Sequence, residues 1–280
     1  MSDLLLLVQG LSVGFIQEET WFRERWSEPI RDLNAKVFRK EVTAVVGASG
    51  SGKSLLAHAV MGVLPYGAFW NGRMEYQGKE LTKERLKKLR GKEITLIPQG
   101  VNGLDPLMKA GNQIRKGRRD KESFRRCKEL LKRYGLPPET EDMYPFELSG
   151  GMARRVLIAG AMMEDPHLVI ADEPTPGLDD RAARQVMRHF REIADQGAGV
   201  LLITHDLELS LEMADRVLIF LDGRVVEELE MEKGLGDTEI RKFKRAPQHP
   251  YTKDLLESIP GGKRPWAEEG GEEQYLGQSR

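Results

Sequence analysis

The sequence predicts an α/β fold in which a mostly parallel sheet presents its functional residues where the strands end. The apolar, β-branched run 42–46 indicates a buried strand, and a glycine-rich loop, residues 47–54, follows it directly. A second apolar run, 168–171, ends in the adjacent carboxylates Asp172 and Glu173. Because ligands of open α/β sheets bind at the carboxyl edge of the strands, both features predict a site at that edge.

The loop after the first of these strands fits the pattern G-x-x-x-x-G-K-[ST]. Its glycines allow backbone N–H groups to surround the α- and β-phosphates of a nucleotide, at the N-terminus of a helix. Lys53 is expected to reach the β- and γ-phosphates, and the Ser54 hydroxyl to bind Mg²⁺. The alternative is a glycine-rich turn that binds nothing. The residues assigned to the nucleotide in this loop are Gly47, Ser49, Gly50, Ser51, Gly52, Lys53 and Ser54.

The two carboxylates after run 168–171 have different expected roles. Asp172 suits an outer ligand of Mg²⁺, and Glu173, one residue further out, suits a general base that activates the attacking water. For an isolated Asp-Glu pair, capping of the next helix would be the better interpretation. The phosphate loop in the same chain reverses that preference.

A Ser-Gly-Gly segment (149–151) lies between these two motifs and precedes a predicted helix. In the simplest interpretation, Ser149 caps this helix after a glycine turn. In a functional interpretation, Ser149, Gly150 and Gly151 offer a hydroxyl, backbone N–H groups and the positive end of a helix dipole to a second anion, such as a γ-phosphate.

The order of these motifs resembles that of the ABC transporter ATPases. The phosphate loop is followed by Gln99, then Leu148-Ser149-Gly150-Gly151, then Asp172-Glu173, then Gly177-Leu178-Asp179, and finally His205. With the flanking strands, the similarity extends from near Leu5 to near Glu228 and covers most of the chain. The resemblance implies a P-loop NTPase (RecA-like) ABC ATPase core with an inserted α-helical subdomain and a short C-terminal extension.

The resemblance also implies how ATP is bound and hydrolysed. Two such subunits pair head to tail, so the Ser-Gly-Gly segment of one would close over the ATP held by the phosphate loop of the other. Glu173 would polarise the water, His205 would contact the γ-phosphate and Glu173, and Gln99 would touch both Mg²⁺ and water. The implied Mg²⁺ contacts are therefore Ser54, Gln99 and Asp172. Taken alone, a histidine or a glutamine after a strand is more often an ordinary loop residue.

Two further site residues follow from the resemblance. Asp179 would communicate across the dimer, and its alternative role is to cap a helix that begins at Asp180. An aromatic ring is expected to stack on adenine, and Phe15, just after the predicted strand 11–13, is the better candidate. The alternatives, in an unusual insert, are Trp21, Phe22 and Trp26.

Three features indicate which branch of the family the sequence resembles. The stretch Tyr144-Pro145-Phe146-Glu147 resembles importers rather than exporters. Met152, where glutamine is commonest, is usual in one of the two ATPase paralogues of oligopeptide, dipeptide and nickel importers. Residues 245–256 contain the His-Pro-Tyr-Thr segment of the same branch, and Leu255, Leu256 and Ile259 are expected to pack from a short helix after it.

The resemblance therefore implies an ATP-hydrolysing subunit that energises uptake of peptides, nickel or a metal chelate. Its partners would be integral-membrane permease subunits, a second ABC ATPase subunit (a paralogue or a second copy) and, indirectly, an extracytoplasmic substrate-binding protein. The alternatives are a soluble ABC ATPase of repair or translation, and a nucleotide-binding regulator that does not hydrolyse. A regulator would be expected to lack Glu173 or His205, and both are present.

Composition agrees with an enzyme that works at a membrane surface. The chain has 280 residues and a net charge of −1, which argues against general affinity for nucleic acid. No apolar stretch of about 18 residues is present, and the resemblance then implies a peripheral position on the cytoplasmic face of the cell membrane. The single cysteine, Cys127, excludes a disulfide within the chain. The basic segment 115–133 fits a solvated helix face, with contact to anionic lipid and the permease as the alternative.

The expected organisation is a split core with an insertion. Residues 1–97 and 157–235 form the two parts of the ATPase core, 98–156 the helical subdomain with the Ser-Gly-Gly segment, and 236–280 the C-terminal extension.

Overall fold

A six-stranded, mostly parallel sheet forms the centre of the computed structural model, which describes residues 3–20, 23–232 and 243–259. The strand order is β10-β9-β3-β8-β7-β6. The parallel strands are β3 (Val42–Val46), β6 (Ile94–Ile97), β7 (Leu168–Asp172), β8 (Gly199–Thr204) and β9 (Arg216–Leu221). At one edge, β10 (Arg224–Glu230) runs antiparallel to β9. The predicted α/β class is confirmed.

The apolar runs become strands because they can be buried on both faces. Every residue of β3, β7 and β8 is buried, as expected for β-branched and aliphatic residues in a parallel sheet covered on both sides. One side is covered by α6 (Asp180–Asp195) and α7 (Leu207–Met213), whose apolar residues join the core of the sheet. The other side faces α1 (Lys53–Met61) and the second sheet.

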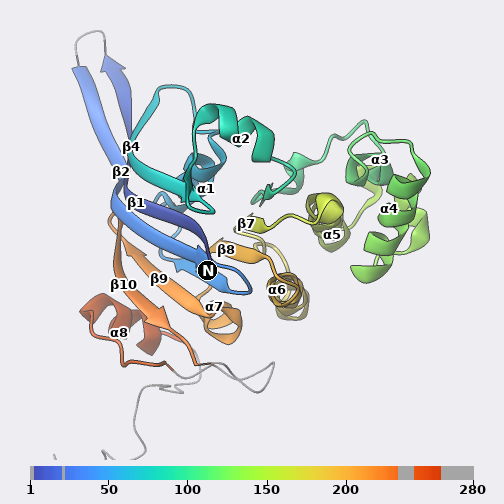
Figure 1. Cartoon of the computed structure of the whole chain (residues 1–280). Helices are drawn as coiled ribbons and strands as arrows, with labels where there is room; N and C mark the ends of the chain where they lie inside the picture. The colour runs from blue at the N-terminus through green and yellow to red at the C-terminus, as the bar shows by residue number, and fades with distance from the viewer. Residues whose placement is uncertain (1–2, 21–22, 233–242, 260–280) are drawn as a thin grey trace, which may run out of the picture.

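The second sheet is antiparallel and has the order β2-β1-β4-β5. It contains β1 (Leu4–Thr20), β2 (Arg23–Phe38), β4 (Ala68–Tyr76) and β5 (Lys79–Glu80), and α2 (Lys83–Leu89) follows it. The ends of β1 and β2 project from the body of the molecule (Figure 1). Buried residues of this sheet pack with Leu56 and Val60 of α1 in a shared core.

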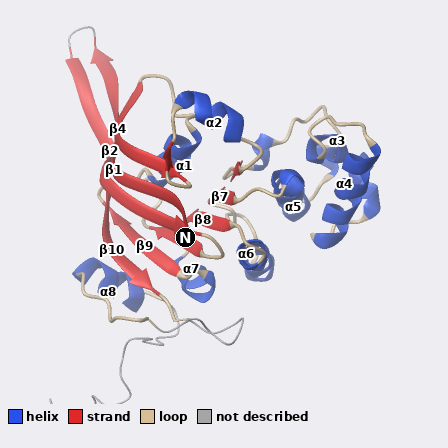
Figure 2. Ribbon diagram, viewed as in Figure 1, coloured by secondary structure: helices blue, strands red, loops and turns tan. Residues whose placement is uncertain are grey.

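The segment between β6 and β7 is helical, as expected for the inserted subdomain, and lies to one side of the sheets (Figure 2). Its helices are α3 (Ala110–Ile114), α4 (Lys121–Arg133) and α5 (Gly150–Ala161), with 3-10 turns at Val101–Gly103, Pro138–Asp142, Pro145–Glu147 and Met162–Glu164. The expected boundary at residue 156 falls inside α5, which continues for another turn.

An aromatic contact links this helical segment to the sheet. The ring of Tyr134, at the end of α4, meets His189 of α6 edge to face, with 4.9 Å between ring centroids. Both residues are buried, and burial lowers the pKa of His189.

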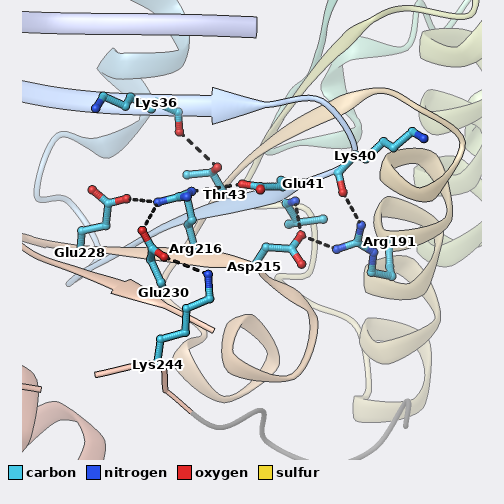
Figure 3. A network of polar contacts seen from close by, with 11 residues as sticks. Lys36, Lys40, Glu41, Thr43, Arg191, Asp215, Arg216, Glu228, Glu230 and Lys244 are labelled. Atoms are coloured by element: carbon cyan, nitrogen blue, oxygen red, sulfur yellow. Dashed lines mark hydrogen bonds and ion pairs between the residues drawn. The ribbon is translucent and has the colours of Figure 1, made fainter. Parts of the chain in front are cut away.

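The amino ends of the central strands are joined by a network of charges (Figure 3). Arg216 forms ion pairs with Glu41, Glu228 and Glu230, and Lys244 binds Glu230 in turn. Arg191 of α6 pairs with Asp215, whose carboxylate also accepts the backbone N–H of Val42. This network lies at the amino ends of β3 and β9, so it fixes the strands without occupying the edge where a ligand is expected.

The C-terminal extension returns to the sheet. Phe243 bridges Met231, and the carboxylate of Glu227 accepts the backbone N–H groups of Gln248 and His249 at the start of α8 (Pro250–Glu257). Leu256 is buried in the core, and Leu255 and Ile259 pack against it. The predicted apolar positions of this helix are confirmed. Within the described residues, no helix combines the length and apolar character needed to cross a bilayer.

We expect Leu256→Ala to weaken the attachment of α8. Truncating a buried leucine leaves a cavity, so the free energy of opening this helix should fall by about 2 kcal/mol. Amide hydrogen exchange of residues 250–257 measures the change, with the exposed Lys253→Ala as the control. Unaltered protection of α8 in the leucine variant would contradict the described packing.

Candidate active site

The glycine-rich loop leaves β3 and forms a concave turn before α1. A Cβ on Gly47 would lie 2.4 Å from the carbonyl oxygen of Phe220, so a larger residue would push the loop away from β9. Gly50 and Gly52 have φ angles of 75° and 98°, in the left-handed region that favours glycine. Gly52 is also the residue at which α1 begins, so the loop and the helix N-terminus form one continuous curve.

Lys53 lies folded over this loop. Its ammonium donates to the carbonyl oxygens of Gly47 (2.9 Å) and Ala48 (2.7 Å), and its Nζ is 3.9 Å from Oε1 of Glu173. The side chain is 4% exposed. Burial lowers the pKa of Lys53, and the nearby carboxylates of Glu173 and Asp172 oppose that shift. A cation held this way can exchange carbonyl oxygens for the oxygens of an incoming anion.

Ser54 and Asp172 meet across the end of the sheet. The Ser54 hydroxyl donates to Oδ1 of Asp172 over 2.9 Å, and Asp172 is 4% exposed. Burial raises the pKa of the Asp172 carboxyl, and the Ser54 hydrogen bond partly offsets it. A hydroxyl beside a carboxylate is a hard oxygen donor set, which fits Mg²⁺ together with waters and phosphate oxygens. The described residues contain no cluster of three His, Cys, Asp or Glu that could hold a metal on its own.

Glu173 and His205 form the clearest pair in the site. Oε2 of Glu173 and Nδ1 of His205 are 2.7 Å apart. The carboxylate is almost fully buried, whereas the imidazole is 49% exposed. This arrangement follows from strand register, because Asp172 lies opposite Ile203, and Glu173 and His205 each come directly after their strand. Glu173 is therefore held between a buried ammonium and a half-exposed imidazole.

The other predicted site residues are not joined to the phosphate loop in this single chain. Ser149 caps α5 by accepting the N–H of Met152, and Asp179 caps α6 by accepting that of Ala182, as their simpler interpretations predicted. Among the described residues, no hydrogen bond or ion pair links either one to the loop. A Cβ on Gly150 or Gly151 would meet nothing within 4 Å, so internal packing does not require these glycines.

Gln99 and Phe15 lie at the edges of the site. Gln99 is exposed directly after β6, and only its carbonyl oxygen is bonded to another described residue. Phe15 on β1 is half-buried and packs against the core that contains α1. Of the alternative aromatic residues, Trp21 and Phe22 lie outside the described part of the chain.

Sequence reasoning missed one residue that reaches this site, Arg154 of α5. Its guanidinium donates to the carbonyl oxygens of Gln99 (2.9 Å), Glu173 (3.1 Å) and Pro176 (3.4 Å). The available signal was an arginine within the apolar pattern of the helix after the Ser-Gly-Gly segment, at a position that should be buried. Its partners are backbone atoms, which no sequence pattern identifies.

Part of the basic segment 115–133 is paired with neighbouring carboxylates. Arg118 pairs with Glu164, Arg125 with Glu122 and Glu129, and Arg126 with Asp165. The buried Arg115 pairs with Glu141. These pairs favour the solvated-surface interpretation over a lipid-binding patch.

We expect Asp172→Asn to stabilise the nucleotide-free protein at neutral pH. Burial raises the pKa of the Asp172 carboxyl above its value in the unfolded chain, so the ionised carboxylate lowers the free energy of unfolding at neutral pH. Below the unfolded pKa, about 3.9, the carboxyl is protonated in both the folded and the unfolded state, and this effect disappears. Asparagine can still accept from Ser54. Urea unfolding should show a higher free energy of unfolding for the variant than for wild type at pH 7, and this difference should shrink as the pH is lowered toward 4. A loss of stability at pH 7 would contradict this assignment.

Comparisons with known proteins agree with this geometry. Residues 30–176 match the family model described as ABC transporter. The chain is 36% identical over 271 residues to the oligopeptide transport ATP-binding protein OppD of Bacillus subtilis (strain 168), covering 91% of this chain and 72% of that protein. It is 35% identical over 270 residues to a putative peptide import ATP-binding protein of Brucella abortus (strain 2308), covering 91% and 77%.

Solved structures show the same fold. A dimeric, post-hydrolysis form of the ATP-binding cassette MJ0796, bound to ADP and phosphate, superimposes with a TM-score of 0.71 at 24% identity, covering 82% of this chain and all of that one. The cbiO1 subunit from Clostridium perfringens, part of an ABC transporter complex, gives a TM-score of 0.66 at 27% identity, covering 81% and 88%. With the phosphate loop, the Ser54–Asp172 contact and the Glu173–His205 pair, these matches show that the chain belongs to the ABC transporter family, as an ATP-hydrolysing subunit.

Proposed function

We propose that this protein is the ATP-hydrolysing subunit of a peptide importer, bound noncovalently to permease subunits at the cytoplasmic face of the membrane. The observation that carries the proposal is the buried Glu173 carboxylate, held 2.7 Å from His205 and 3.9 Å from Lys53 at the end of the phosphate loop. Relatives named as oligopeptide or peptide import ATP-binding proteins support peptides as the cargo class. Nickel or a metal chelate remains the alternative cargo from the sequence.

In this mechanism, each residue of the site has one task. Lys53 would exchange the carbonyls of Gly47 and Ala48 for β- and γ-phosphate oxygens, while backbone N–H groups of the loop hold the phosphates. Glu173 would accept a proton from the attacking water. His205 would orient Glu173 through Nδ1 and present its other nitrogen to the γ-phosphate.

Mg²⁺ is part of the proposal. Ser54 and Asp172 would hold the ion, with Gln99 as a further contact, and the bound ion would neutralise phosphate charge. The chemistry of the donor set supports this assignment, because both side chains offer oxygen ligands, Ser54 from the start of α1 and Asp172 from the end of β7.

A second ATPase subunit completes the proposed site. The Ser-Gly-Gly segment is exposed at the start of α5, and its glycines have open space beside them. A partner's nucleotide could therefore approach the backbone closely, which supports head-to-tail pairing with a paralogue or a second copy. Closure on ATP and reopening after hydrolysis would move the permease between two states. In that assembly, Asp179 would lie between the subunits and Phe15 would stack on adenine.

We expect Glu173→Gln to bind ATP but to hydrolyse it about a hundredfold to a thousandfold more slowly, because the amide cannot accept the water's proton. Binding of a fluorescent ATP analogue and steady-state phosphate release measure the two effects. The control is Glu208→Gln, on the exposed side of α7. Near-normal hydrolysis by the Glu173 variant would refute the base assignment.

Affinity purification tests the importer assignment. A tagged chain is isolated from detergent-solubilised membranes of its host, and proteins present at stoichiometric levels are identified by mass spectrometry. We expect permease subunits and a second ATPase. Recovery with ribosomes or nucleic acid would favour a soluble ABC ATPase and would overturn the importer proposal.

A further inference from the structure

We propose that Arg154 is a positioning residue that ties the backbones of Glu173 and Gln99 to helix α5. The inference deepens the proposed function and rests on it, because it concerns the same ATPase site. Arg154 touches neither the phosphate loop nor the Ser54–Asp172 contact among the described hydrogen bonds. It acts on the site through hydrogen bonds to the backbone of Gln99, Glu173 and Pro176.

The geometry of the guanidinium is specific to arginine. One of its terminal nitrogens bonds both Gln99 and Glu173, and the other bonds Pro176, so carbonyl oxygens of two segments converge on a single planar fork. These segments follow β6 and β7, the strands whose ends border the site. A lysine carries its three N–H donors on a single nitrogen, so it cannot reproduce the planar fork in which two nitrogens bond these carbonyl oxygens.

The cost of placing this cation here indicates a role beyond packing. Arg154 is 5% exposed, its hydrogen-bond partners among the described residues are all uncharged carbonyls, and its Nε is buried without a partner. A buried charge without an opposite charge is destabilising, and burial lowers the pKa of Arg154 accordingly. An apolar side chain would fill the same space at less cost. The hydrogen bonds to the site segments are what the arginine adds.

Glu173 needs such support because its backbone is strained. Its φ is 45°, in the left-handed region that non-glycine residues rarely adopt. Two hydrogen bonds hold this conformation: the N–H of Glu173 donates to Ile203 (2.8 Å), and its carbonyl accepts from Arg154 (3.1 Å). Loss of the second bond would let the peptide rotate, and the carboxylate would move away from His205.

The position of Arg154 on α5 connects this support to the dimer. The Ser-Gly-Gly segment forms the start of α5, and Arg154 lies one turn further along the same helix. In the proposed assembly, ATP held by the partner would contact the start of α5. A shift of the helix would then displace the backbones of Gln99 and Glu173 of this chain, because the Arg154 side chain is bonded to both. Arg154 would thus link closure of the dimer to the geometry of the general base.

The test compares kcat and KM for ATP of the assembled complex containing wild type, Arg154→Met, Arg154→Lys or Arg115→Gln. Arg115 is the matched control: it is equally buried in the helical segment, but its partners are Glu141 and Asn112. Thermal unfolding of each variant is measured in parallel. Glu173→Gln is included to verify that hydrolysis belongs to this site.

We expect Arg154→Met to lower kcat about tenfold to a hundredfold, because the base is misplaced, with KM for ATP changed by less than about twofold. Arg154→Lys should retain an intermediate kcat. Arg115→Gln should lower the unfolding temperature while leaving kcat unchanged. Unchanged kcat in Arg154→Met, a rise in KM alone, or an equal loss of kcat in Arg115→Gln would overturn the proposal. If wild type failed to hydrolyse ATP, the proposed function itself would fall, and this inference with it.

Discussion

The alignment of three neighbouring parallel strands is the constraint on which the rest of the structure depends. Backbone hydrogen bonds place Val46 of β3 opposite Thr204 of β8, and Asp172 of β7 opposite Ile203. The phosphate loop, Glu173 and His205 therefore emerge at one edge, although the loop precedes Glu173 by more than a hundred residues in sequence. A slip of one residue between β7 and β8 would separate the carboxylate from the imidazole, since successive residues of a strand point to opposite faces. The apolar strands fix this register because both of their faces are buried.

Within this frame, the site holds several charges that would be costly elsewhere. Lys53, Asp172 and Glu173 are each about 5% exposed or less. The positive charge of Lys53 reduces the free-energy cost of burying the two carboxylates. Burial nevertheless raises the pKa of Asp172 and lowers that of Lys53. The site is thus arranged for a ligand that brings both negative charge and a cation.

The helical segment and the sheet share one hydrophobic core, and specific aromatic and polar contacts join them as well. The Tyr134–His189 ring pair and the bonds from Arg154 join them. Arg154 is the contact that reaches the site itself, whereas the charge network around Arg216 fixes the opposite end of the strands.

The sequence by itself determined the fold class and the strands that border the site, because local pattern encodes burial. The same patterns predicted site roles for Lys53, Ser54, Asp172 and Glu173, and the family resemblance added His205. The sequence also located the apolar face of α8. Tertiary structure alone decided other partners: Lys53 bonds the loop carbonyls, and Arg125 and Arg126 of α4 pair with carboxylates. Arg154 belongs entirely to this second group. Its partners are backbone carbonyls brought together by strand register, and a carbonyl has no signature in an amino-acid sequence.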